Sequence, residues 1–431
     1  MKRGQLSRTH RNFLAAAIAA VAVLASLTAA PASASTRVGK DPSQLSNWNV
    51  ISVNTLLADP TKDAREVFLY EGFVDAAMYD AVVGIDGRYR PYHLHAKAPR
   101  GASDVAAAVS AAHAVLTYYC PTQQASLDNS YAASLATIPD GQAKTDGIAY
   151  GLLAANDIIA LRAHDGRYAP IFFTRPPAPG VWRPTPPTFT PMAVPWMGFV
   201  TPLLIRSGDQ FDPGPPPALT SRRYTRDLLE TEAYGSLNST VRTPDQTATA
   251  LFFSGNTAVQ MVNGLVDQAA VRGLDVADAA RMYAAVGMSM ADTLIAVWWV
   301  KYVYGFWRPI TAIQLADTDG NPATTADASW TPLLTTPPYP EYVSGYSGIT
   351  GDFSQALEDA FGTRHLDLTL MSTAVAGATR HYATGQGMRD DVINARIWLG
   401  IHFRTADVRG VRMGQQVADW ALARYFQPVH H

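Results

Sequence analysis

The stretch DVADAARMYAAVGMSMADTLIAVWWVKYVYGFWRP, residues 275–309, decides the fold of this chain. Its apolar residues recur three and four positions apart, which is the spacing of a helix that is buried on most of its sides. The run is long enough to cross a bilayer, but Asp278, Arg281 and Asp292 place charges inside it. We therefore predict a buried core helix rather than a membrane span.

Four segments on the N-terminal side have the same helical spacing and are rich in alanine. They are residues 65–85, 104–119, 123–138 and 144–166. A last helix, about residues 408–426, is predicted to close the fold. Strand-like alternation is nearly absent, so the pattern predicts an all-α protein.

The composition changes between residues 169 and 217, where about half of the 29 prolines lie among Phe and Trp. Such a segment is typical of an irregular but packed connection, not of a flexible Gly/Ser linker. Helices resume near Ser221. We predict two helical bundles: an N-terminal helical region over 35–168, a Pro-rich connection over 169–220, and a C-terminal helical region over 221–431.

The N-terminus has the pattern of a secretory signal, residues 1–34. A basic start precedes an apolar run from Phe13 to Leu27, and Ala32-Ser33-Ala34 follows as a cleavage site. The run is short for a bilayer span, so a cleaved signal is favoured over a retained anchor. We expect a secreted protein with no transmembrane span in the mature chain.

Charge and cysteine content exclude several kinds of partner and site. The net charge is −2, and 34 Lys and Arg residues among 431 give no reason to expect nucleic acid. The single cysteine, Cys120, excludes an intramolecular disulfide and a multi-cysteine zinc site.

Two cations lie at the end of the predicted core helix, in KYVYGFWRP. Lys301 and Arg308 are seven residues apart, about two helical turns, so both can reach the same side. Pro309 is expected to end or kink the helix. Taken alone, the two cations are also consistent with helix-terminal charges that reach from the core into water.

Two further stretches add residues of the same character. In PPYPEYVSGYSG, residues 337–348, Ser344 and Gly345 lie on a turn before a predicted helix, where backbone N–H groups gather around an anion. In NARIWLGIHF, Arg396 and His402 would lie about 120° apart on an unbroken helix. They converge if the chain turns at Gly400.

The combined pattern resembles the superfamily of vanadium-dependent haloperoxidases and type-2 phosphatidic acid phosphatases. The pattern is Lys, six residues, Arg-Pro; then Ser-Gly on a turn; then Arg, five residues, His. AAMYDAVVGIDGRYRPY, KYVYGFWRPITAI and DGNPATTADASWTPLLTTPPYPEY are similar to secreted bacterial members of the haloperoxidase type. The resemblance implies an all-α pair of helical bundles with an oxyanion site in one of them.

The resemblance also implies a role for each matched residue. The oxygens of vanadate or phosphate would be held by Lys301, Arg308, Ser344, Gly345 and Arg396. His402 would bind vanadium axially, or attack phosphorus in a phosphatase. Vanadate is the implied cofactor, with hydrogen peroxide and a halide or small organic molecule as substrates, whereas a phosphatase would need no cofactor and would act on a phosphomonoester.

The main departure is Tyr346, which stands where these proteins usually carry an acid–base histidine. A phenol has a reference pKa near ~10, so at neutral pH it donates a hydrogen bond but is a poor base. We expect its hydroxyl to face the oxyanion pocket and to preserve donation while proton transfer is attenuated. His381 is the leading candidate to have taken over the proton.

Three more residues are predicted to surround the site. Trp298 fits an aromatic wall, and Tyr339 occupies a position before the turn that settles no halide preference. Asp391 is a candidate acceptor that orients Arg396. These residues would shape the pocket rather than bind the oxyanion directly.

The sequence thus favours a vanadate-dependent peroxidase of the haloperoxidase type and leaves two alternatives open. One is an acid phosphatase that acts through a phosphohistidine on His402. The other is a non-catalytic oxyanion-binding homologue, which Tyr346 favours and the intact His402 argues against. Oligomeric state is not indicated by the sequence.

Overall fold

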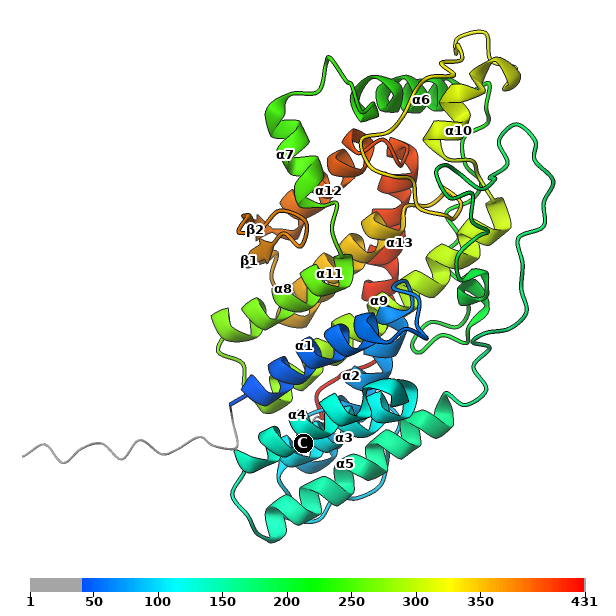
Figure 1. The fold of residues 1–431 in the computed structure, drawn as a ribbon. Helices are drawn as coiled ribbons and strands as arrows, with labels where there is room; N and C mark the ends of the chain where they lie inside the picture. Colours follow the sequence, from blue (N-terminus) through cyan, green and yellow to red (C-terminus); the bar gives the residue numbers. More distant parts are fainter. Residues whose placement is uncertain (1–40, 430–431) are drawn as a thin grey trace, which may run out of the picture. The chain divides into compact units, whose positions relative to one another are not determined.

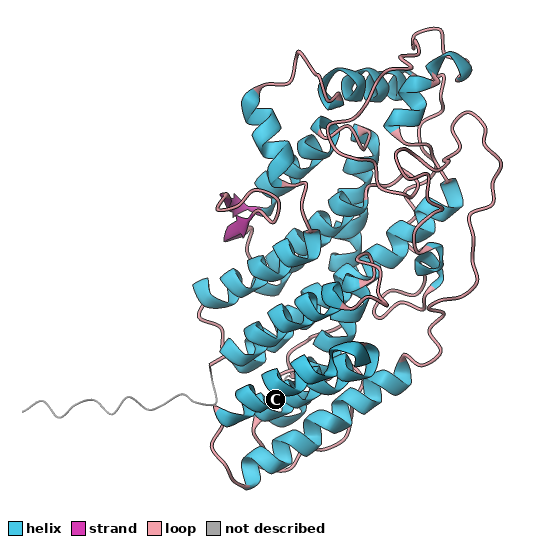
Figure 2. Ribbon diagram, viewed as in Figure 1, coloured by secondary structure: helices cyan, strands magenta, loops and turns pink. Residues whose placement is uncertain are grey.

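The computed structural model describes residues 41–429, and the predicted signal, residues 1–34, lies outside them. Helices dominate the described residues, as predicted (Figures 1 and 2). The N-terminal helices are α1 (Ser43–Ala58), α2 (Val67–Asp86), α3 (Asp104–Tyr119), α4 (Gln124–Ala136) and α5 (Gln142–Leu161). The short 3₁₀ helix η1 (Pro121–Gln123) precedes α4.

The C-terminal helices carry most of the predicted site. They are α6 (Arg222–Gly235), α7 (Pro244–Phe252), α8 (Thr257–Val271), α9 (Val276–Tyr304), α10 (Pro309–Gln314), α11 (Gly345–Phe361), α12 (Gly385–Trp398) and α13 (Arg404–Leu422). The 3₁₀ helix η3 (Ala316–Thr318) follows α10. The last helix therefore begins four residues before the predicted start at residue 408.

Helix α9 is the core helix that the sequence predicts. It is long and apolar enough to span a membrane by length and composition, but 94% of its apolar window is buried inside the protein. It packs against α2 and α11. The Asp275 side chain caps its start by accepting the backbone N–H groups of Ala277 and Asp278.

The end of α9 differs from the expectation. The helix ends at Tyr304 because Gly305 adopts a left-handed conformation, with φ of 53°, and its N–H caps the Lys301 carbonyl. Pro309 does not end this helix; it is the first residue of α10, where a missing N–H is harmless. Lys301 and Arg308 therefore come from two different helices.

The Pro-rich segment is irregular and packed, with one 3₁₀ helix, η2 (Pro195–Phe199), among its described residues. Asp292 of α9 holds it in place. The carboxylate accepts the backbone N–H groups of Leu203, Leu204 and Ile205 at 2.7, 2.6 and 2.8 Å. The division of the chain at residues 168 and 220 stays a prediction.

One small β-hairpin adds to the helices. Strands β1 (His365–Met371) and β2 (Thr379–Thr384) pair antiparallel. In HLDLTLM the three leucines are buried and alternate with less buried residues, which is the period of a half-buried strand. The alternation in this stretch could have been recognised from the sequence. In the rest of the described chain, strands are nearly absent, as predicted.

Candidate functional site

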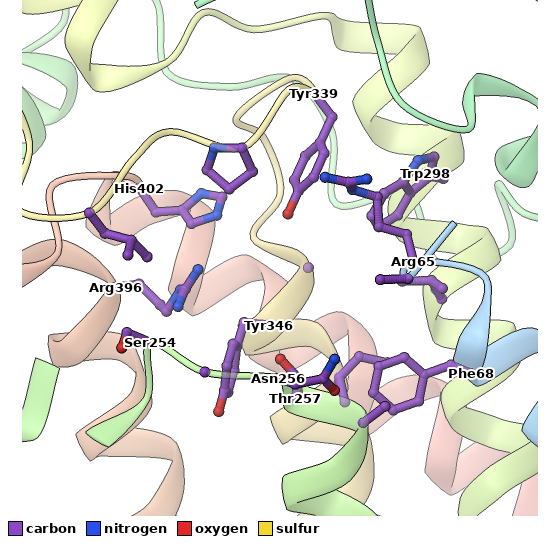
Figure 3. Close-up of a pocket in the computed structure, with 18 residues that line it drawn as sticks. Arg65, Phe68, Ser254, Asn256, Thr257, Trp298, Tyr339, Tyr346, Arg396 and His402 are labelled. Carbon is purple, nitrogen blue, oxygen red and sulfur yellow. The ribbon is translucent and has the colours of Figure 1, made fainter. Parts of the chain in front are cut away.

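Three buried cations lie near His402, since the charges of Arg308, Lys301 and Arg396 all lower its pKa. Lys301 lies in the last turn of α9, Arg308 precedes α10, and Arg396 lies in the last turn of α12. Their exposed fractions are 0%, 0% and 6%. Arg396 and His402 line the same cavity of about 270 Å³ (Figure 3).

Lys301 is anchored by backbone carbonyls of the turn before α11. Its Nζ donates to the Pro340 carbonyl at 2.7 Å and to the Glu341 carbonyl at 3.1 Å. Burial and the neighbouring Arg308 charge hold the pKa of Lys301 well below its usual range. An anion in this site would reverse that shift.

Arg308 links this turn to the loop that carries His402. Its Nε donates to the Tyr339 carbonyl at 2.8 Å, and its Nη1 donates to the Ile401 carbonyl at 2.7 Å. Nη1 also lies 3.2 Å from Nε2 of His402. Its Nη2 is buried and has no hydrogen-bond partner among the described residues.

Arg396 shows the same incomplete pairing. Its Nη1 donates to the Phe253 carbonyl at 3.1 Å, while its Nε is buried without a partner among residues 41–429. Burial lowers the pKa of Arg308 and of Arg396. Because buried N–H groups are almost always paired in native proteins, these free donors indicate a site shaped for an anion.

No carboxylate in the described part of the chain forms an ion pair with Lys301, Arg308 or Arg396. Three uncompensated buried cations are unfavourable unless a ligand supplies negative charge. The donor set therefore fits a multiply charged oxyanion.

His402 follows the turn that the sequence predicts. Gly400 has a φ of 77°, which breaks α12 and brings Arg396 and His402 to one cavity. Burial, followed by the charges of Arg308, Lys301 and Arg396, holds the pKa of His402 well below its usual range. The imidazole is therefore neutral at physiological pH.

Glu341 is a site residue that the sequence reasoning missed. Its Oε1 lies 3.1 Å from Nδ1 of His402 and accepts the Phe403 N–H at 2.9 Å. Burial raises the pKa of Glu341 to about 8. The available signal was a charged residue inside the otherwise uncharged stretch PPYPEYV.

The two contacts of the imidazole define its tautomer. Arg308 can only donate, so Nε2 of His402 accepts and carries a lone pair. Nδ1 then carries the proton and donates to Glu341. The basic nitrogen of His402 is thus on the side of the cations.

Ser344 and Gly345 form the N-terminus of α11, as predicted. Ser344 is the N-cap residue, whose Oγ accepts the Ser347 N–H at 3.4 Å, and Gly345 lines the cavity. The helix dipole adds positive potential where the cations already lie. Burial raises the pKa of nearby Asp407 to about 7, although its hydrogen bond from Ser347 opposes that shift.

Trp298, the residue expected to form an aromatic wall, packs against Tyr339. Their ring centroids are 5.1 Å apart. The Tyr339 ring lies 4.7 Å from the Arg308 guanidinium, 5.1 Å from Nζ of Lys301 and 5.5 Å from the Arg65 guanidinium. Figure 3 shows its hydroxyl pointing into the cavity.

Tyr346 lines the cavity, but the expected direction of its hydroxyl is wrong. The hydroxyl donates to Oε1 of Gln260 at 2.5 Å and points away from His402 (Figure 3). The ring face lies 4.7 Å from the Arg396 guanidinium. Gln260 supplies a buried acceptor on α8, and this acceptor draws the phenol out of the oxyanion cavity.

Asp391 and His381 do not join the site. Asp391 accepts hydrogen bonds from Arg380 at 3.0 Å and Tyr382 at 2.9 Å, not from Arg396. Five residues of helix place Asp391 and Arg396 about 140° apart around α12, which explains the miss. His381 lies on β2, 55% exposed, and pairs with Asp367 at 3.1 Å.

The rest of the cavity comes from regions that the sequence reasoning left out. The start of α2 contributes Arg65 and Phe68, and the N-terminus of α8 contributes Asn256 and Thr257 (Figure 3). Leu294 of α9 also lines the cavity. No local motif marks these residues, since each reaches the cavity only through tertiary packing.

Comparisons with known proteins agree with this geometry. Residues 281–431 match the family model of the VCPO second helical-bundle domain. The chain is 29% identical over 155 residues to vanadium chloroperoxidase of Curvularia inaequalis. The aligned region covers 30% of this chain and 25% of that protein. The matched region thus spans about a quarter of that relative's length.

Solved structures show the same fold over a larger part of the chain. The first bacterial vanadium-dependent iodoperoxidase aligns with a TM-score of 0.75 and 24% identity, covering 90% of this chain and 97% of that one. An apo-type bacterial vanadium-dependent chloroperoxidase aligns with a TM-score of 0.67 and 19% identity, and the alignment covers 84% of this chain and 93% of that one. Residues 281–431 therefore match the second helical-bundle domain of VCPO, and the chain shares the fold of bacterial vanadium-dependent haloperoxidases.

Proposed function

We propose that the protein is a secreted, vanadate-dependent enzyme of the haloperoxidase type that uses hydrogen peroxide to oxidise a halide or a small organic substrate. The observation that carries the proposal is the pair of free buried donors, Nη2 of Arg308 and Nε of Arg396, next to the neutral His402. The iodoperoxidase and chloroperoxidase folds support the reaction class. The signal pattern in residues 1–34 supports export.

The residues present fit vanadate. Its oxygens would be held by Lys301, Arg308, Ser344, Gly345 and Arg396. Nε2 of His402, the lone-pair nitrogen, is the atom that would bind vanadium. Bound vanadate supplies a Lewis acid that activates peroxide without a change of metal oxidation state.

The protein's own groups perform three tasks around that cofactor. The cations neutralise negative charge inside a cavity largely withdrawn from water, where each charge-assisted contact is strongest. Glu341 holds the proton of His402 on Nδ1 and so keeps Nε2 basic. Phe68, Leu294 and Trp298 provide an apolar side on which a polarisable halide or an organic molecule can rest.

We further propose that the enzyme is attenuated. The Tyr346 hydroxyl is engaged with Gln260, so this position supplies no proton transfer in the cavity. General acid–base groups typically contribute ~10²–10⁴-fold, which sets the expected reduction in turnover.

The test is to load the purified protein with orthovanadate and assay it in two ways. Halogenation of an organic acceptor is measured with hydrogen peroxide and chloride, bromide or iodide in turn, and phosphomonoester hydrolysis is measured without vanadate. Vanadate-dependent halogenation that disappears in His402→Ala supports the proposal. Hydrolysis that vanadate inhibits would instead identify an acid phosphatase, and vanadate binding without either activity would identify an oxyanion-binding homologue.

A further inference from the structure

A second polar cluster lies inside the protein, between α1, α2 and α9. Glu71 and Asp75 are one turn apart on α2 and only 3% and 2% exposed. Asn49 and Ser52, on one face of α1, are 1% and 0% exposed. Five of their oxygen atoms are buried without a hydrogen-bond partner among the described residues: Oδ1 of Asn49, Oγ of Ser52, Oε1 and Oε2 of Glu71, and Oδ1 of Asp75.

The side chains of α1 are turned toward the carboxylates. Ser52 lies against Glu71, and Asn49 lies against Asp75, without a hydrogen bond of regular geometry in either case. The Asn49 amide donates from Nδ2 to the Leu45 carbonyl at 3.1 Å, and its Oδ1 is buried without a partner among the described residues. Neutral oxygens as well as charged ones are therefore gathered at one place.

Other buried carboxylates of this fold accept hydrogen bonds from the protein. Asp80 and Asp292 each accept three backbone N–H groups. Asp352 accepts the hydroxyls of Ser289 and Thr293 at 2.7 and 2.8 Å. Glu71 and Asp75 thus stand apart, because no residue in the described range 41–429 donates to them in a regular hydrogen bond.

Helix α9 closes the third side of the cluster. A Cβ built at Gly287 would lie 1.9 Å from Oδ2 of Asp75, so the carboxylate occupies the space that any side chain at 287 would fill. Tyr283, one turn earlier, donates its hydroxyl to Ser46 and not to the acids. Within residues 41–429, no Lys, Arg or His forms an ion pair with Glu71 or Asp75.

Two adjacent carboxylates in such surroundings must be neutralised by protons or by a cation. Burial raises the pKa of both groups, and their proximity raises the pKa of Asp75 further. Protonation would supply only two O–H donors, one on each acid, to a cluster of five unpaired oxygens. A hard cation would satisfy all five oxygens at once.

We propose that Asn49, Ser52, Glu71 and Asp75 form a buried binding site for a divalent cation of the calcium class. Two carboxylates match a double positive charge. Calcium accepts oxygen ligands in irregular geometry and binds carboxylates through both oxygens, whereas magnesium requires a near-ideal octahedron. The described residues hold no cluster of three or more His, Cys, Asp or Glu ligands, which disfavours zinc and other soft metals here.

The position of the site gives it a structural consequence. Glu71 follows Phe68 by one helical turn, and Phe68 lines the oxyanion cavity. A cation here would join α1 to α2, next to Gly287 of α9, about one helical turn from the residue of α2 that lines the oxyanion cavity. The proposed cation site is separate from the oxyanion cavity. An experiment that overturns the cation site therefore leaves the proposed enzymatic function unaffected, and the reverse also holds.

The direct test is calcium binding by the purified, chelator-treated chain. We expect about one calcium ion per chain in equilibrium dialysis, and a Tm higher by a few degrees in millimolar calcium chloride than in EDTA. The shift should be larger at pH 8 than at pH 5, because protons compete for the carboxylates. A protein that binds no calcium and whose Tm ignores it at pH 8 overturns the proposal and identifies a protonated acid pair.

Variants separate a specific site from a general effect. The pair Glu71→Gln with Asp75→Asn should abolish calcium binding and the Tm shift, whereas the buried control Asp352→Asn should retain both. Asn49→Asp adds a third carboxylate and should tighten calcium binding at least several-fold, which keeps the proposal testable if the double variant fails to fold. Equal calcium responses in wild type and the double variant would overturn the site.

Discussion

Nδ1 of His402 lies 3.1 Å from Oε1 of Glu341, and the two side chains are 2% and 1% exposed. The same carboxylate oxygen accepts the Phe403 N–H, so Glu341 holds the imidazole and the backbone beside it. Lys301 and Arg308 hold the other end of this turn through the carbonyls of residues 339–341. One turn therefore positions both the cations and the histidine.

The first prediction concerns Glu341. Glu341→Ala should weaken vanadate binding ~10–100-fold, the range typical when the partner of a metal-ligating histidine is removed. Glu341→Gln keeps an acceptor for Nδ1–H and should retain more of the affinity. Titration with vanadate, followed by Tm or calorimetry, measures both. Equal affinity in wild type and Glu341→Ala would show that His402 needs no orienting partner.

The second prediction is that replacing Arg396 weakens vanadate binding without lowering the stability of the protein that has no bound anion. Arg396→Met removes one of three buried like charges, so without an anion the variant should be as stable as wild type or more stable. It should bind vanadate ~10–100-fold more weakly, since a charge-assisted contact contributes ~1.5–3 kcal/mol. Arg380→Met, outside the site, is the matched control. A melting response to vanadate like that of wild type would contradict the role of Arg396.

The third prediction follows from the lowered pKa of Lys301. In the folded protein without an anion, Lys301 binds fewer protons than the unfolded chain does, so it destabilises the fold as pH falls through its ordinary value. A bound oxyanion raises its pKa, and that of Glu341, so binding should take up protons at pH 8. Calorimetry in two buffers of different ionisation enthalpy measures the uptake.

The ligand's own titration enters that measurement, and Lys301→Met controls for it. Proton uptake should be larger in wild type than in this variant under identical conditions. An apparent enthalpy in wild type that does not depend on the buffer would count against a lowered pKa of Lys301.

Most of the helical fold, and the burial of Lys301, Arg308, Arg396 and His402 close to one another, could be predicted from the sequence. Residues 104–119 form α3 as predicted, because the alanine-rich spacing and the Ser103 cap agree. The convergence of Arg396 and His402 followed from one local feature, the left-handed Gly400. Such local features can be predicted from the sequence, because the residue that causes each one lies within a few positions of the residues that it affects.

The missed features depend on partners far away in the chain. Glu341 gains its role from His402, 61 residues later, and the Tyr346 hydroxyl is placed by Gln260, 86 residues earlier. The role expected for Asp391 failed for a local reason, since it lies on another face of α12 than Arg396. The angle between Asp391 and Arg396 around their helix can be calculated from the sequence, whereas the hydrogen-bond partner of the Tyr346 hydroxyl cannot.

The last prediction separates the two phenols of the cavity. Tyr346→Phe leaves Oε1 of Gln260 buried and unpaired, so it should destabilise the fold by ~1–3 kcal/mol and change turnover little. Tyr339→Phe keeps the ring beside the three cations but removes the hydroxyl that points into the cavity (Figure 3), so turnover should fall ~10-fold or more with vanadate affinity retained. His381→Ala, on the exposed hairpin, should leave turnover unchanged. Steady-state halide oxidation with vanadate-loaded variants measures the order. If Tyr346→Phe lost turnover and Tyr339→Phe did not, the hydroxyl of Tyr346 would have to leave Gln260 and enter the cavity during the reaction.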